Sequence, residues 1–194
     1  MQSPADRGRG LRLVQDPPEF PTLTTPFHDL DEYVRLPRME GLVLSPDGSR
    51  LYVSGTTGAV AVFSVDPASG TAAFVDEYVD AQDSLDLYGA GTMALTPDGS
   101  RLILANATSP TITPVRYGIT VFVIERQTGA LSLLRHYQPG ADGLDDVYKP
   151  MDVVLSADGR YAYFPTTYGS GGSLAVFGVT PTPQAPEITV LHEG

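Results

Sequence analysis

The chain has 194 residues, no cysteine and a formal net charge of −11. Such an acidic surface repels phosphate backbones and anionic lipid headgroups, so we expect neither nucleic acid nor a membrane as a partner. The absence of cysteine excludes disulfides, thiol nucleophiles and thiolate metal sites. With 20 glycines and 17 prolines the apolar runs are short, which disfavours long helices and favours strands joined by turns.

The N-terminal region is expected to hold one isolated strand. Residues 8–15 resemble residues 129–134, which end a later repeat, and residues 3–6 have the composition of the turn before such a strand. We therefore expect residues 1–40 to supply an orphan outer strand and a long loop that leads into the first repeat. These residues contain no apolar stretch of signal-peptide length, and no run in the chain is long enough to span a membrane, which leaves the localisation open.

A two-part passage then occurs three times. Its first part reads LVLSPDGSRLYVSG at 42–55, MALTPDGSRLILAN at 93–106 and VVLSADGRYAYFPT at 153–166. Its second part reads AVAVFSV at 59–65, GITVFVI at 118–124 and SLAVFGV at 173–179. The Asp-Gly pairs at 47, 98 and 158 are 51 and 60 residues apart. Spacings near 50 are typical of propeller blades and kelch-like arrays rather than of short helical repeats.

Each repeat is expected to form four strands. In the first repeat they span about 42–45, 50–54, 59–65 and 71–79, with Ser-Pro-Asp-Gly as the turn between the first two. Proline presets φ for such a turn, and glycine takes the left-handed conformation that ends it. The strands are apolar on both faces, as in residues 121–124, so we expect each sheet to be covered on both sides.

These features predict an all-β fold: a β-propeller with three four-stranded blades and an N-terminal orphan strand, either as an open arc or as part of a larger ring. The blades are assigned to residues 41–91, 92–150 and 151–194. Because propellers close with about four to eight blades, three blades leave two open flanks. Further blades in a longer chain, self-association that completes a ring, or a stable open arc would each account for those flanks.

The repeats resemble those of the lactonase-like seven-bladed β-propellers with YVTN-type repeats. The matching residues are Leu30-Asp31, Ser45–Gly48, Leu51–Val53 and Ala59–Phe63 in the first repeat, Leu85-Asp86, Thr96–Gly99 and Ile119–Phe122 in the second, and Leu144-Asp145, Ser156–Gly159 and Leu174–Phe177 in the third. The resemblance implies a propeller fold and, for some members of that family, hydrolysis of sugar lactones; members are often exported. The matching residues are turn and core positions, so the resemblance carries over no catalytic residue.

The connections between strands sort onto two ends of each blade. In a four-stranded meander, the turns that join strands one and two, and strands three and four, lie together at one end, which we call the turn end. The opposite end carries the long and variable connections, such as 107–117 and 139–150, and we call it the long-loop end. Long loops on a rigid scaffold are common binding sites, so we expect a small-molecule or protein ligand to bind there.

Aspartates followed by a tyrosine precede the first strand of each repeat. The candidate ligand-binding residues at the long-loop end are Asp31, Tyr33, Asp86, Tyr88, Arg116, Asp145, Tyr148 and Lys149, of which the cations could hold a carboxylate or phosphate. Four of the carboxylates, Asp83, Asp86, Asp142 and Asp145, could instead bind calcium, the one cofactor that the sequence suggests. Alternatively, the aspartates cap turns, the tyrosines pack between blades and the cations balance charge.

The histidines are few and scattered. His28 lies beside Asp29, and the pair could act as a general base for lactone hydrolysis, or His28 could be a solvated loop residue. His136 lies on an outer strand, where an exposed side chain is expected. The sequence therefore favours a partial propeller that serves as a ligand- or protein-binding scaffold. The alternative is a sugar-lactone hydrolase resembling the 6-phosphogluconolactonase-like propellers, so enzymatic activity stays open.

Overall fold

The computed structural model describes residues 39–55, 58–79, 87, 89–107, 117–138, 147–168, 171–179 and 188–192. They form twelve strands: β1 (Met39–Leu44), β2 (Arg50–Gly55), β3 (Ala59–Val65), β4 (Ala72–Val79), β5 (Ala90–Leu95), β6 (Arg101–Ala107), β7 (Tyr117–Ile124), β8 (Leu131–Tyr137), β9 (Val154–Leu155), β10 (Tyr161–Tyr168), β11 (Gly171–Val179) and β12 (Ile188–His192). Among the described residues there is no helix long and apolar enough to cross a membrane. The orphan strand expected at residues 8–15 lies outside the described residues.

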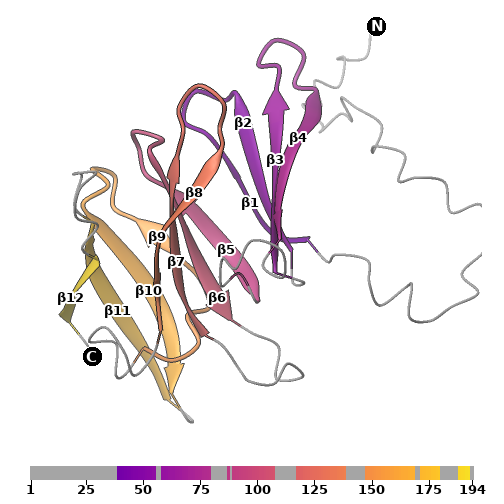
Figure 1. Cartoon of the computed structure of the whole chain (residues 1–194). Coiled ribbons are helices and arrows are strands. Elements are labelled where there is room, and N and C mark those ends of the chain that lie inside the picture. The colour runs from indigo at the N-terminus through magenta and orange to yellow at the C-terminus, as the bar shows by residue number, and fades with distance from the viewer. Residues whose placement is uncertain are drawn as a thin grey trace, which may run out of the picture.

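The strands form three antiparallel sheets of four. The hydrogen-bonded orders are β1-β2-β3-β4, β5-β6-β7-β8 and β9-β10-β11-β12, so each sheet is a simple meander of consecutive strands. Figure 1 shows the sheets standing face to face in chain order, from the indigo and magenta first sheet to the orange and yellow third sheet. The predicted all-β fold with three four-stranded units is confirmed.

The strand limits follow the predicted ones closely in the first sheet. β2 and β3 agree with prediction to within one residue, but β1 begins at Met39 because an irregularity in the register lets Met39 pair with Gly55. The third sheet departs further, since β9 has only two residues. Its neighbour β10 carries Pro165, which has no N–H to continue the ladder, although the Pro165 carbonyl still accepts a 3.0 Å hydrogen bond from Met151 N.

The three Asp-Gly turns share one hydrogen-bonded geometry. In the first turn, Gly48 has a φ of 72° and its N–H donates to Ser45 O over 2.8 Å. The Asp47 carboxylate accepts hydrogen bonds from Ser45 Oγ at 2.6 Å and from Ser49 N at 3.0 Å. The corresponding bonds form at Asp98 and Asp158. The repeated Asp-Gly sequence therefore encodes a repeated and rigid turn end.

These bonds predict an acid-sensitive contribution to stability. The Ser45 hydroxyl, followed by the Ser49 amide, lowers the pKa of Asp47 to about 2, and the Ser156 hydroxyl does the same for Asp158. Because the folded-state pKa is below that of the unfolded chain, near 3.9, this contribution is present above pH 4 and is lost as the pH falls toward 2. We expect urea midpoints of Ser45→Ala to vary less between pH 4 and 2 than those of the wild type or of Ser132→Ala. Equal slopes for all three proteins would contradict this assignment.

Two apolar cores hold the sheets together. The first core lies between the first and second sheets and buries Tyr52 against Phe122 and its neighbours. The second lies between the second and third sheets and buries Val121 and Phe177. In it the rings of Phe164 and Phe177 meet edge to face, with their centroids 5.1 Å apart. The second sheet is thus covered on both faces, as its sequence predicts.

The first strands of the sheets approach one another closely. A Cβ atom on Gly41 of β1 would lie 2.6 Å from Gly91 O of β5, so the backbones can meet only because the residue is glycine. The Ser54 hydroxyl adds a 2.5 Å hydrogen bond to the same carbonyl oxygen. β5 in turn contacts β9. The strands β1, β5 and β9 are therefore the inner strands of the stack, and β4, β8 and β12 are the outer ones.

The expected exposure of His136 is wrong. Its side chain is half-buried, and His136 Nδ1 lies 2.8 Å from Thr120 Oγ1, which also accepts a 2.6 Å hydrogen bond from Asn106 Nδ2. The three residues cross β6, β7 and β8 on the face turned toward the first sheet. The imidazole can lie against the sheet because its neighbour on β7 is Gly118, where a side chain would meet the ring.

Candidate functional site

Most of the sequence-predicted site residues lie outside the described residues. These are His28, Asp29, Asp31, Tyr33, Asp83, Asp86, Tyr88, Arg116, Asp142 and Asp145. The calcium and general-base hypotheses therefore stay predictions. Within the described ranges, no group of three or more His, Asp or Glu side chains is placed to hold a metal ion. Two of the predicted residues, Tyr148 and Lys149, are described, and both precede β9 at the long-loop end.

Lys149 has an unusual backbone conformation. Its φ of 44° is the only positive φ of a non-glycine residue in the described part of the chain. The equivalent residue before β5 is Gly89, with a φ of 67°, so this position requires a left-handed backbone in both repeats. For a lysine this conformation costs about 1 kcal/mol or more. The adjoining segment is anchored by a 3.0 Å hydrogen bond from Thr167 N to Tyr148 O.

Charged and apolar side chains surround the ends of the inner strands. Glu40 on β1 and Met151 and Asp152 before β9 are exposed, and Lys149 is half-exposed. A Cβ atom on Gly91, at the start of β5, would lie 3.9 Å from Glu40 Oε2. We call this group, Glu40, Gly91, Lys149, Met151 and Asp152, the axial surface. Within this group Lys149 is the one cation and can pair with an acidic group of a small ligand, while the carboxylates of Glu40 and Asp152 can accept hydrogen bonds from its hydroxyl groups.

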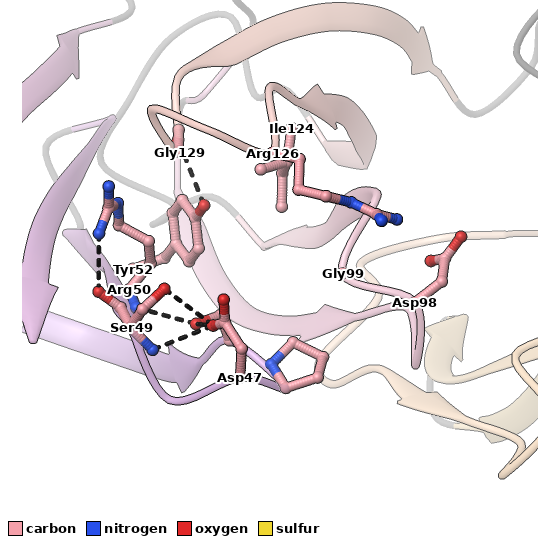
Figure 2. A pocket seen from close by; sticks show the side chains of 11 residues that line it. Asp47, Ser49, Arg50, Tyr52, Asp98, Gly99, Ile124, Arg126 and Gly129 are labelled. Atoms are coloured by element: carbon pink, nitrogen blue, oxygen red, sulfur yellow. Dashed lines mark hydrogen bonds between the residues drawn. The ribbon is translucent and has the colours of Figure 1, made fainter. Parts of the chain in front are cut away.

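A cleft on the opposite side of the molecule was not anticipated from the sequence. It has a volume of about 410 Å³ and lies at the turn end, between the first and second sheets. Figure 2 shows Arg50 and Tyr52 on one side of it and Asp98 and Arg126 on the other. Its lining comes from the first two Asp-Gly turns and from residues 124–129, whose sequence indicates only turn and core positions.

The strongest donors of this cleft already have structural partners. Arg50 donates to Thr128 O at 3.1 Å and to Gln127 O at 3.3 Å, which ties the first sheet to the turn after β7. Tyr52 donates to Gly129 O at 3.2 Å, and burial raises its pKa to about 12. The cleft thus marks a packed junction between two sheets, whose polar groups serve mainly to hold the turns together.

Solved structures with the same arrangement of sheets are known. A putative 6-phosphogluconolactonase from Bacteroides fragilis has a TM-score of 0.59 and 18% identity, over 80% of this chain and 37% of its own. The periplasmic gluconolactonase PpgL of Pseudomonas aeruginosa has a TM-score of 0.59 and 21% identity, over 81% and 39%. The Cps50 (Swd1) β-propeller domain from Myceliophteria thermophila has a TM-score of 0.54 and 15% identity, over 81% and 43%.

This chain folds as three blades of a β-propeller. It spans about two fifths of the length of the propellers that it matches. Neither a protein-family model nor a curated protein sequence matches it. The expected likeness to lactonase-like propellers is confirmed for the fold, since 6-phosphogluconolactonase-like structures are among its neighbours. At these identities the likeness of the propeller blades carries no statement about activity.

Proposed function

We propose that these three blades form a ligand-binding scaffold whose ligand is a small hydroxylated carboxylate or its lactone. The ligand binds at the long-loop end, on the axial surface. The left-handed backbone of Lys149 carries the proposal. Strained residues are concentrated at binding sites, where the surrounding structure holds a side chain in a required direction. A glycine serves the same backbone position in the second blade, so the lysine is not needed for the fold.

Two substitutions separate the charge of Lys149 from its strain. Lys149→Ala removes the ammonium group but keeps a Cβ, whereas Lys149→Gly removes both the charge and the strain. We expect Lys149→Gly to raise the melting temperature by a few degrees, corresponding to about 1 kcal/mol, and Lys149→Ala to change it little. Calorimetric titration with gluconate should show binding that is about tenfold weaker in both variants. Equal binding by the wild type and Lys149→Ala would rule out this site.

The second candidate is a sugar-lactone hydrolase. It is supported by two solved neighbours that are called lactonases, the putative 6-phosphogluconolactonase of Bacteroides fragilis and the gluconolactonase of Pseudomonas aeruginosa. Lactone opening adds water and releases an acid, so a pH indicator follows it directly. The same protein samples should be tested with glucono-δ-lactone. Acceleration by the wild type that is lost in Asp31→Ala, Asp86→Ala or Asp145→Ala would favour the hydrolase over the scaffold.

A further inference from the structure

The outer face of the first sheet is apolar although no sheet formed by the described residues covers it. We call this surface the leading face; its residues are Leu42, Leu44, Phe63 and Phe74, with the two phenylalanine rings 5.8 Å apart. Leu42 is 72% exposed, while the residues at its repeat position, Met93 and Val153, are 8% and 5% exposed. In the second and third sheets the corresponding faces pack against the preceding sheet. The leading face therefore retains the residues of a buried interface.

The far face of the third sheet shows the complementary feature. This trailing face consists of Val154, Tyr163, Leu174 and Val176. Leu174 is 49% exposed, whereas Val60 and Ile119, its equivalents in the first and second sheets, are fully buried. Those equivalents pack against the leading face of the following sheet. The trailing face thus has the chemistry that covers a leading face twice within this chain.

At the turn end, the Asp-Gly turns of the second and third sheets contact the turn of the preceding sheet, whereas in the described part of the chain no such contact is seen at the first turn. A Cβ on Gly99 would lie 3.3 Å from Pro46 Cδ, and one on Gly159 would lie 2.6 Å from Pro97 Cδ. Each Asp-Gly turn therefore sits against the corresponding residue of the sheet before it. At Gly48, the first glycine of the series, no atom of the described residues lies within 4 Å of this position. The first sheet thus has room for a preceding turn as well as for a preceding apolar face.

We propose that a second copy of this chain covers both flanks, so that the trailing face of each copy packs against the leading face of the other. This contact continues the packing already seen between consecutive sheets and requires no new kind of surface. The described residues of two copies carry six four-stranded sheets, a number within the four to eight that close a propeller. Closure would also complete the ring of inner strands around the axial surface, to which the described part of one copy supplies three.

Sedimentation velocity on the full chain tests the proposal. At tens of micromolar and 150 mM NaCl, we expect a species of about twice the 20.7 kDa of one chain. Leu42→Asp on the leading face and Leu174→Asp on the trailing face should each weaken association by roughly tenfold or more, because each places a charge in an apolar contact. Ser132→Asp adds the same charge at an exposed position on neither face and should leave association unchanged. Circular dichroism and melting curves establish that each variant is folded.

Mixing the two defective variants gives the decisive measurement. Leu42→Asp retains an intact trailing face and Leu174→Asp an intact leading face, so an equimolar mixture should form a mixed two-chain species through one intact contact. Unfolded or generally damaged variants could not restore each other in this way. If Leu174→Asp alone associates as the wild type does, the leading face pairs with itself and the head-to-tail arrangement is wrong. A wild type that remains monomeric overturns the proposal, because the leading face would then be covered by other residues of the same chain or left open.

Salt provides an independent readout. Each copy carries a net charge of −11, so long-range repulsion opposes association at low ionic strength. An apolar contact should therefore strengthen between 50 and 500 mM NaCl. Association that weakens over this range would indicate ion pairing between charged surfaces and would contradict the proposed apolar contact.

Discussion

Replacing Phe177 with alanine is expected to lower the free energy of unfolding by about 3–5 kcal/mol. The Phe177 side chain is completely buried between the second and third sheets and meets Phe164 edge to face. Its removal leaves a cavity in the second core and ends the contact between the two rings. Urea unfolding followed by circular dichroism measures the loss, and a reduced midpoint with an unchanged slope would show that only stability has changed.

Phe63 offers a matched control because it occupies the same repeat position. It lies on the leading face and is only half-buried. In the dilute monomer, Phe63→Ala should therefore cost roughly half as much as Phe177→Ala or less. Equal losses at submicromolar concentration would mean that Phe63 is already covered within one chain. The leading face would then not be an open flank.

Gly118→Ala is expected to destabilise the protein by about 2–3 kcal/mol, although glycine to alanine within a strand is usually harmless. A Cβ at this position would collide with the backbone oxygen of Tyr137 and would lie 2.7 Å from the His136 ring. The first and third repeats have Ala59 and Ser173 at the equivalent position, so the restriction is particular to the second sheet. Thermal unfolding should show a melting temperature lower by several degrees or more.

Two further variants identify the cause of that loss. Gly172→Ala, in β11, would place its Cβ 3.8 Å from Thr166 O, an ordinary contact, and should change stability by less than about 0.5 kcal/mol. Gly118→Ala combined with His136→Ala should lose less stability than the two single losses added together, because the collision with the ring is then removed. Strict additivity would show that the Tyr137 carbonyl alone restricts the position.

The repeat made most of the fold predictable. Its Asp-Gly turns, its β-branched and aromatic runs and the apolar character of both strand faces correctly indicated three four-stranded sheets packed on one another. The shortness of β9 could not be read in the same way. The sequence of the third repeat is as strand-like as the others, and the effect of Pro165 depends on which neighbour its missing N–H would have faced.

The candidate site was less predictable, for a physical reason. Repeat positions report the packing that all blades share, whereas a binding site depends on residues that break the repeat. Lys149 was singled out for its charge, but its left-handed backbone became visible only in the structure, beside the glycine that serves the second blade. Similarly, His136 looked like a surface residue because its contact with Thr120 depends on a hydrogen bond across strands and on the small size of Gly118.

The outer strands share one irregularity that bears on how this molecule can aggregate. The register between the third and fourth strands shifts at Val62/Phe63, at Val121/Phe122 and at Val176/Phe177, the same place in every repeat. Such bulges twist an edge strand and interrupt its row of free amide and carbonyl groups, which makes strand-by-strand addition of another chain unfavourable. Concentrated or heated solutions should therefore form amorphous aggregates that bind little thioflavin T, instead of amyloid-like fibrils.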